Sequence, residues 1–493
     1  MTMSQRNQYI LSDAAFPAVP TDLFINGQWV TAQSGKRIDV FDPSTTKVLA
    51  SVADASVEEG LAAVNAAAKA APAWAATAPR ARAEILRKAF ELMSARIDSF
   101  AQLISLENGK ALSDARGEAL YAAEFFRWYA EEAVRAQGEL SLAPSGANRI
   151  LVQYQPVGVS ILITPWNFPA AMATRKIGPA LAAGCTCVLK PATETPLTAY
   201  AMAALLKEAG VPDGVVNVVT SSKSGSMVSA MLHDPRVRKL SFTGSTEVGR
   251  ILLKEAADQV INCSMELGGN APFIVFDDAD LDAAIEGAMV AKMRNGGEAC
   301  TAANRFYVQR GLIETFAARL SERMGALKMG AGCLATTQLG PLVNQDSRDK
   351  VASLVDDAKA RGGRVLIGGK TPDADGYFYP ATVIVDVHPD STLLHEEIFG
   401  PVAAIVPFDT EAEAAELANQ TEYGLAAYVY THDLERGLRF SEKLESGMIG
   451  LNRGLVSDPA APFGGVKQSG IGREGGHHGL LEFMEAKYIA TSW

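Results

Sequence analysis

The 493-residue chain lacks several features that would place it in a specialised class. It has no run of basic residues and carries a formal net charge of −11, so nucleic acid and acidic membrane surfaces are not expected partners. No segment reaches the roughly 18 consecutive apolar residues that span a bilayer. The first 20 residues have neither an apolar signal-peptide core nor an arginine-rich amphipathic pattern. We therefore expect a cytoplasmic protein that acts on a small molecule.

Cysteine is also scarce, and its five residues do not form pairs at metal-binding spacing. An odd number of cysteines without a CxxC pair favours free thiols in a reducing compartment and no metal site. Cys185 and Cys187 alternate within the apolar run CTCVLK and are interpreted as strand packing residues.

No internal repeat or low-complexity linker is present, and 493 residues are too many for one hydrophobic core. Apolar and charged residues recur at helical spacing over 57–77, about 80–105 and about 117–135, which predicts an N-terminal helical layer. From residue 157 short apolar runs alternate with amphipathic segments, and a second such series begins after Gly268. This rhythm predicts two α/β lobes with parallel, doubly wound sheets.

Two segments predict strands outside both lobes. Residues 139–156 read as two strands around a Ser-Gly turn, and residues 484–493 read as a third. Such strands leave unpaired edges, which a second subunit can satisfy. We expect a homodimer or homotetramer.

Polar residues follow the predicted strands of the first lobe, where ligands of parallel sheets bind. Asn167 lies between two prolines and can donate to a developing oxyanion, although an Asx turn is an open alternative. Lys190 can bind a nucleotide or face solvent. Gly244 and Gly249, in FTGSTEVG, open a helix whose backbone amides can hold a pyrophosphate, but the motif is weak.

Two further residues carry chemistry. Cys300, in NGGEACTAANRFYV, lies in a loop of small residues that leaves a thiol reachable, and a helix start behind it would lower its pKa. By itself this segment also fits a buried structural cysteine. Glu266, in SMELGGN, ends an apolar strand and can be a general base with a raised pKa, or a glutamate bound to backbone amides.

Seven motifs together resemble the aldehyde dehydrogenase superfamily from about Leu23 to the C-terminus. In chain order they are PWNFP, KPATETP, FTGSTEVG, MELGGNAP, GGEAC, EEIFGPV and APFGGVKQSGIGREGG. The C-terminal third is most similar to the succinate-semialdehyde dehydrogenases. The resemblance implies a Rossmann-like dinucleotide-binding domain (1–136 and 157–266), a catalytic domain (267–476) and oligomerisation strands (137–156 and 477–493).

The resemblance also implies site residues. Cys300 matches the nucleophile that forms a thiohemiacetal and then a thioester, and Asn167 with the Cys300 N–H matches the oxyanion hole. Glu266 matches the base that activates the hydrolytic water, which argues against acyl transfer to coenzyme A. The positions that match cofactor-binding residues are Trp166, Lys190, Thr193, Gly244, Ser245, Gly249, Glu397 and Phe399.

The predicted substrate is a small aldehyde with a distal carboxylate. Arg175, Arg294 and Ser457 match the carboxylate-binding residues of succinate-semialdehyde dehydrogenases, and Phe168 and Phe463 match residues of the substrate pocket. Alternatives are glutarate semialdehyde, a neutral aliphatic or aromatic aldehyde, or a non-enzymatic structural protein on this scaffold.

Thr193 bears on the cofactor. Relatives that prefer NAD often carry glutamate three residues after the lysine, where it repels a 2′-phosphate. Thr193 removes that repulsion and Lys223 can add attraction, so NADP is predicted to be preferred over NAD. Two other departures are Ala302, which replaces the second cysteine of a redox switch, and Glu298, to which the sequence assigns no role. Arg453 can face either the pocket mouth or solvent.

Overall fold

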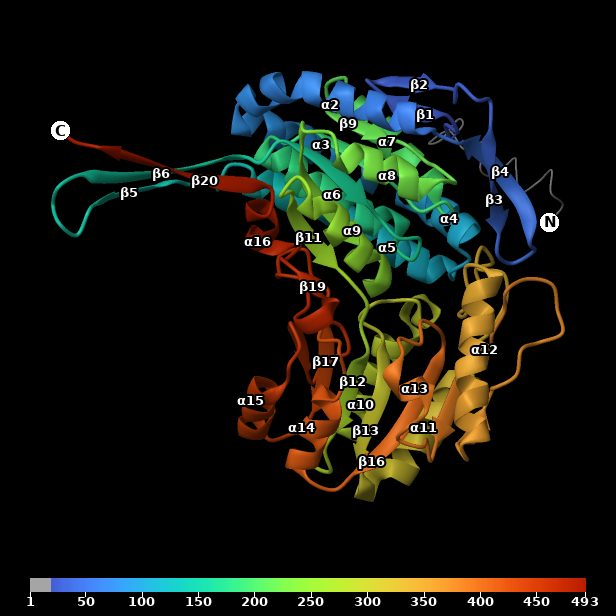
Figure 1. The fold of residues 1–493 in the computed structure, drawn as a ribbon. Coiled ribbons are helices and arrows are strands. Elements are labelled where there is room, and N and C mark those ends of the chain that lie inside the picture. The colour runs from blue at the N-terminus through green and yellow to red at the C-terminus, as the bar shows by residue number, and fades with distance from the viewer. Residues whose placement is uncertain (1–18) are drawn as a thin grey trace.

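The computed structural model describes residues 19–493, which form two α/β units and a projecting arm (Figure 1). The prediction about a leader segment falls largely on residues 1–18, outside the described residues. Within residues 19–493, no helix is long and apolar enough to cross a membrane.

The first unit is built on an eight-stranded sheet with the order β19-β11-β10-β7-β8-β9-β1-β2. Its strands are β1 (Leu23–Ile25), β2 (Gln28–Val30), β7 (Val159–Ile163), β8 (Cys187–Lys190), β9 (Val216–Val218), β10 (Val237–Thr243), β11 (Asn262–Glu266) and β19 (Gly470–Ile471). Strands β7 to β11 are parallel, and the chain runs from β7 outward to β9, then returns to β10 on the other side. The topological switch point therefore lies between β7 and β10.

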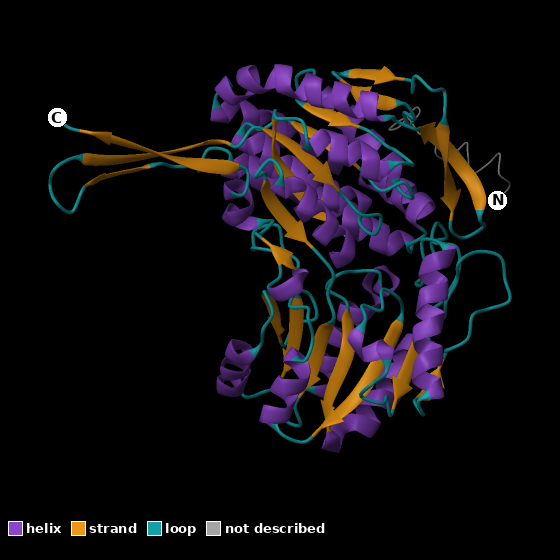
Figure 2. Cartoon of the chain, viewed as in Figure 1, coloured by secondary structure: helices purple, strands orange, loops and turns teal. Residues whose placement is uncertain are grey.

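Helices cover both faces of this sheet (Figure 2). They are α2 (Val57–Ala76), α3 (Pro79–Ser94), α4 (Ile97–Asn108), α5 (Leu112–Glu132), α6 (Pro169–Ala183), α7 (Pro196–Ala209), α8 (Ser224–Leu232), α9 (Thr246–Ala257) and α16 (Gly476–Leu481). Along β7, Ile161 belongs to one core and Leu162 to the other, so the strand is apolar on both sides. The single helix predicted over 80–105 is two helices, because the backbone leaves the helical conformation at Arg96 (φ −121°, ψ 21°).

The second unit contains a seven-stranded sheet with the order β14-β15-β16-β13-β12-β17-β18. Its strands are β12 (Ala271–Val275), β13 (Ala303–Gln309), β14 (Arg364–Ile367), β15 (Thr382–Val385), β16 (Val402–Phe408), β17 (Ala426–Tyr430) and β18 (Met448–Leu451). Its helices are α10 (Leu281–Met293), α11 (Ile313–Gly325), α12 (Gln345–Ala360), α13 (Thr392–His395), α14 (Glu411–Asn419) and α15 (Leu434–Lys443), and short 3-10 turns span Arg294–Gly297, Arg310–Leu312 and Lys467–Ser469. All neighbouring strands are parallel except β14 with β15. The predicted α/β class is confirmed in both units.

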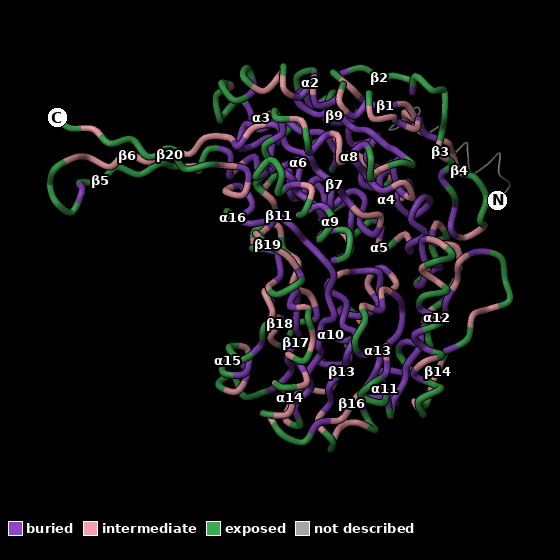
Figure 3. The backbone as a smooth tube through the Cα atoms, in the orientation of Figure 1, coloured by how far each residue is buried: buried purple, intermediate pink, exposed green. Residues whose placement is uncertain are grey.

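The arm is a three-stranded antiparallel sheet of β5 (Glu139–Leu142), β6 (Arg149–Pro156) and β20 (Met484–Thr491). It extends away from both units, and much of it is exposed (Figure 3). Leu140 and Leu142 are 62% and 56% exposed. A separate two-stranded sheet pairs β3 (Arg37–Asp42) with β4 (Lys47–Ala53).

The chain crosses between the units more than once. Strand β19 lies in the first sheet, antiparallel to β11, although residues 267–476 were predicted to form the catalytic domain. Strand β19 and helix α16 thus pack with the first unit. Gly464, before β19, and Glu474, between β19 and α16, therefore lie close to the end of β11. The predicted domain boundaries otherwise stay a prediction.

Candidate active site

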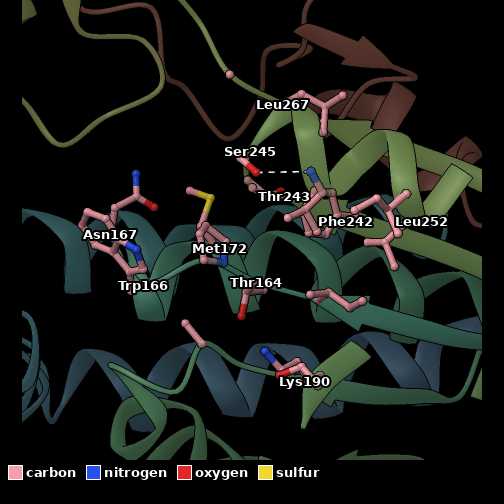
Figure 4. A pocket seen from close by; sticks show the side chains of 18 of the residues that line it. Thr164, Trp166, Asn167, Met172, Lys190, Phe242, Thr243, Ser245, Leu252 and Leu267 are labelled. Carbon is pink, nitrogen blue, oxygen red and sulfur yellow. Dashed lines mark hydrogen bonds between the residues drawn. The ribbon is translucent and has the colours of Figure 1, made fainter. Parts of the chain in front are cut away.

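A cavity of about 920 Å³ opens at the carboxyl ends of β7, β8 and β10, at the switch point of the first sheet. Its walls include Trp166 and Asn167 after β7, Lys190 at the end of β8, and Gly244 and Ser245 after β10 (Figure 4). These five residues come from three separate chain segments. Parallel strands bring them to one edge, as the order of motifs predicts.

Helix α9 begins directly after β10, and the backbone amides of its first turn have no partner within the helix. Ser245 is the N-cap of α9, and its hydroxyl accepts from the Val248 amide at 3.3 Å. Beyond the cap, Val248 and Ile251 line the cavity and are 43% and 53% exposed, which gives an apolar shelf beside a polar helix start. This combination fits a nucleotide base and its phosphates. Gly249 does not line the cavity: a Cβ there would lie 2.5 Å from Leu267, so close packing explains this glycine.

Lys190 and Thr193 line the same cavity. Burial lowers the pKa of Lys190, and the nearby Glu194 carboxylate opposes that effect. The Thr193 hydroxyl donates to the Glu194 carboxylate at 3.3 Å. Lys223, directly before α8, is exposed, and its neighbours Ser224–Ser226 line the cavity. The cavity wall here thus carries a carboxylate that the sequence argument overlooked.

The second unit supplies the opposite wall through Glu397 and Phe399. The rings of Trp166 and Phe399 meet edge to face with centroids 5.3 Å apart. Phe399 has a φ of +56°, a conformation that non-glycine residues seldom adopt and that is typical of functional sites. Glu397 accepts from the Gly269 amide at 3.0 Å, and burial raises its pKa to about 7.

Cys300 also lines this cavity, in the loop between α10 and β13. Asn295, Gly296 and Gly297 all have positive φ (55°, 60° and 82°), so the sequence Asn-Gly-Gly permits the sharp reversal before the thiol. Gly269 is required by close approach, because a Cβ there would lie 2.3 Å from the Cys300 carbonyl oxygen. The loop ends in strand β13, which pairs with β12 and β16.

The expectation of a helix start behind Cys300 is therefore wrong, and so is the lowered pKa inferred from it. Burial raises the pKa of the Cys300 thiol to about 12. Two nearby cations, Arg175 and Arg294, oppose this rise, whereas Glu397 and Glu266 add to it. The resting thiol is protonated at neutral pH.

Glu266 ends β11 and is 2% exposed. Its Oε2 is buried and has no hydrogen-bond partner, and a Cβ on Gly464 would lie 2.8 Å from its Oε1. Burial, and then the negative charge of Glu474, raise its pKa well above the usual value of a glutamate. This shift has the direction expected from the sequence for a general base.

Arg175 is not a free cation. Its Nε lies 2.5 Å from a Glu474 carboxylate oxygen, and Lys176 lies 2.5 Å from the other oxygen of the same carboxylate. All three side chains are nearly fully buried. Arg175 also lies over the ring of Phe463, with the guanidinium carbon 4.0 Å from the centroid. An internal ion pair thus uses part of the guanidinium that the sequence assigned to substrate.

Arg294 differs from Arg175, because within residues 19–493 its side chain makes no ion pair or hydrogen bond. It lies over the Phe168 ring at 5.1 Å, and its charge opposes the rise in pKa that burial causes at Cys300 and Tyr428. Its charge acts on the thiol, although Arg294 does not line the cavity that holds Cys300.

Ser457 follows β18 and lines a separate cavity of about 470 Å³ together with Arg453, which is exposed and donates to the Leu455 carbonyl. No contact in the described chain joins Ser457 to Cys300, so its place in the substrate pocket stays a prediction.

Asn167 is 4% exposed, and its Nδ2 donates to the Glu298 carbonyl at 3.0 Å while Oδ1 has no partner. An amide nitrogen carries two hydrogens, so one remains for a substrate oxygen. Glu298 itself is buried, accepts from the Val343 amide at 3.1 Å, and has its pKa raised to about 8 by burial.

Sequence reasoning missed the buried charged residues that surround these groups, namely Lys110, Glu118, Lys176 and Glu474. Each lies in a segment with a helical or turn pattern that equally predicts a solvated charge. Their partners lie 8 to 298 positions away along the chain, so no local pattern identifies them.

The pattern of the aldehyde dehydrogenase family matches residues 29–489. A succinate-semialdehyde dehydrogenase from Paenarthrobacter nicotinovorans is 54% identical over 445 residues, covering 90% of this chain and 99% of the relative. A glutarate-semialdehyde dehydrogenase from Pseudomonas putida is 48% identical, covering 95% and 97%. The crystal structure of an E. coli NADP-dependent enzyme superposes with a TM-score of 0.95 at 48% identity, covering 96% and 98%. The chain belongs to the aldehyde dehydrogenase family.

Proposed function

We propose that this aldehyde dehydrogenase oxidises succinate semialdehyde to succinate with NADP, through a thioester on Cys300. The observation that carries the choice of substrate is Arg294, a cation six positions before Cys300, whose charge acts on the thiol and which has no ion pair in the described part of the chain. A planar guanidinium matches a carboxylate in geometry and charge. Because Phe168 packs against Arg294, the same site offers an apolar wall for the carbons between the aldehyde and the carboxylate.

The residues divide the reaction into two halves. Because the resting thiol is protonated, Cys300 must lose its proton as it attacks the carbonyl carbon, and Glu266 has the unpartnered carboxylate oxygen to receive it. The Asn167 amide donates to the oxygen as negative charge develops there. The nicotinamide cofactor, when bound, supplies the hydride acceptor. Loss of hydride from the thiohemiacetal carbon leaves a thioester. Once Glu266 has released the thiol proton to solvent, its carboxylate accepts a proton from the water that hydrolyses the thioester.

The cavity supports a dinucleotide as the cofactor. It combines a helix start, an apolar shelf, a buried lysine and the unpartnered buried hydroxyl of Thr243. We propose that Lys190 holds the adenosine ribose and that Glu397 and Phe399 hold the nicotinamide end. The neutral Thr193, with Lys223 directly before the cavity-lining residues 224–226, favours NADP. The Glu194 carboxylate beside Thr193 works in the opposite direction.

Glutarate semialdehyde is a second candidate, because a relative with that activity is as similar as the E. coli enzyme. It carries the same two functional groups, separated by one more methylene. A single methylene in an apolar pocket changes discrimination by only about 1–3 kcal/mol. Arg294 therefore cannot by itself separate the two substrates.

We also propose that the enzyme is a cytoplasmic homodimer or homotetramer. The five cysteines, an odd number without a CxxC pair, suit a reducing compartment. The arm offers two edge strands, β5 and β20, and the exposed Leu140 and Leu142 to a second copy.

The test is steady-state kinetics on succinate semialdehyde, glutarate semialdehyde, butanal and benzaldehyde, each with NADP and with NAD. We expect the highest kcat/KM with succinate semialdehyde and NADP. A neutral aldehyde with an equal or higher kcat/KM refutes the substrate proposal. A tenfold higher efficiency with NAD refutes the cofactor proposal.

A further inference from the structure

The loop that carries Asn167 is held by a buried ion pair from outside the cavity. Lys110 and Glu118 have side chains that are 1% and 0% exposed, and Lys110 Nζ lies 2.6 Å from Glu118 Oε2. Neither residue lines the cavity described above.

Each member of the pair binds a different part of the loop. Lys110 Nζ donates to the Asn167 carbonyl at 2.5 Å and lies 4.2 Å from the centre of the Phe168 ring. Glu118 Oε1 accepts from the amides of Ala170 and Ala171, at 2.8 and 3.3 Å, which are free donors at the start of α6. The pair thus fixes the backbone from the Asn167 carbonyl to the start of α6.

Two further amides complete the hold on the loop. Asn108 Nδ2 donates to the Trp166 carbonyl at 3.1 Å, and Asn295 Nδ2 donates to the Asn167 carbonyl at 2.9 Å and to the Glu298 carbonyl at 2.9 Å. Asn167 Nδ2 donates to that same Glu298 carbonyl. The loop that carries Cys300 and the loop that carries Asn167 are therefore tied together at two oxygen atoms, the carbonyls of Glu298 and Asn167.

The turn that bears Lys110 is itself rigid. It joins α4 to α5, and Gly109 has a φ of +95°. A Cβ on Gly332 or Gly340, both from the second unit, would lie 2.2 or 2.1 Å from the Gly109 carbonyl oxygen. The second unit therefore packs directly on the turn, and Lys110 has little freedom to follow a moving loop.

We infer that Lys110 and Glu118 are positioning residues that aim the Asn167 amide at the substrate oxygen. A buried ion pair contributes little net stability compared with apolar side chains of similar volume, whereas it fixes geometry through several charged hydrogen bonds. Oxyanion donors lose their effect when they are displaced, because their contribution depends on preorganisation. The pair thus acts on the rate of acylation through Asn167. This inference rests on the proposed oxyanion role of Asn167.

The test is the double variant Lys110→Met/Glu118→Gln, which removes both charges and keeps an acceptor for the Ala170 amide. Single-turnover formation of reduced nicotinamide at 340 nm reports the acylation half of the reaction. We expect a fall of about tenfold or more in this rate, below the roughly 100- to 1,000-fold loss expected for a removed oxyanion donor. KM and the cofactor Kd should change by less than about twofold.

The decisive measurement repeats the double variant in an Asn167→Ala background. If the pair acts through Asn167, it should then change the rate by less than about twofold, since coupled residues are not additive. An equal loss in both backgrounds overturns the inference. If Asn167→Ala alone leaves the rate unchanged, the proposed oxyanion role fails instead, so the two failures are distinguishable.

A matched control is Lys239→Met/Glu482→Gln, since Lys239 is a fully buried lysine of the first unit whose Nζ lies 3.2 Å from Glu482. It should leave the single-turnover rate within about twofold of the parent enzyme, whatever its effect on Tm. If the control lowers the rate as much as the Lys110→Met/Glu118→Gln variant does, the effect is general destabilisation and the inference is wrong. For a Lys110→Met/Glu118→Gln variant that fails to fold, Lys110→Arg serves instead, with the same expected non-additivity.

Discussion

Arg294→Ala separates a carboxylated substrate from a neutral one. The guanidinium makes no ion pair within residues 19–493, so its removal leaves no carboxylate without an ion-pair partner. A hydrogen bond to a charged group contributes about 1.5–3 kcal/mol. With tenfold per 1.4 kcal/mol, kcat/KM for succinate semialdehyde should fall by roughly 12- to 140-fold.

The control is the same variant with butanal, which has the same four carbons and no carboxylate. Its kcat/KM should change by less than about threefold. The variant should stay folded, because the lost contact with the Phe168 ring is worth roughly 0.5–1 kcal/mol. Equal losses for the two aldehydes would show that Arg294 supports the active site and does not recognise the distal carboxylate.

Three further predictions concern the remaining site residues. Arg175→Ala should lower Tm far more than Arg294→Ala in a thermal melt, because breaking a buried ion pair costs about 3–5 kcal/mol. Glu474 would then keep only Lys176 as a cation partner. Equal melting temperatures for the two variants would contradict this prediction. Glu266→Gln should slow both the first formation of reduced nicotinamide and the later steady-state turnover, because the same carboxylate receives the thiol proton and activates the water. In the parent enzyme the deacylation rate should rise with pH to a pKa above the usual glutamate range, because only the ionised carboxylate is a base and its pKa is raised; a flat profile would contradict that role. Thr193→Glu should lower kcat/KM with NADP by at least about tenfold while changing it little with NAD, since like charges would then meet; equal changes would refute 2′-phosphate recognition at Thr193.

The sheet architecture follows closely from the sequence because apolar runs of strand length and helical periodicity are local signals. The alternation of apolar runs and amphipathic segments predicted from residue 157 onward agrees with β7 to β11 and the helices between them, and Gly184 ends α6 with a φ of +97°. The break at Arg96 is harder to predict, because 80–105 keeps helical composition throughout.

Proximity could also be predicted for residues that follow parallel strands. Asn167, Lys190 and Ser245 line one cavity because the carboxyl ends of their strands meet at one edge. Electrostatics could not be predicted in this way. The pKa of Cys300 depends on burial and on the charges of Arg175 in α6 and Arg294 in the loop before the thiol. The ion pair of Arg175 depends on Glu474, which lies 299 positions further along the chain.

The central claim is that Cys300 is the nucleophile. The most direct test assays the Cys300→Ala variant at 340 nm with succinate semialdehyde and NADP, and titrates the cofactor by protein fluorescence. We predict no detectable turnover and a cofactor Kd within about threefold of the parent enzyme, because the thiol forms the covalent intermediate and is one of many residues that line the cavity. Retained turnover would contradict the account.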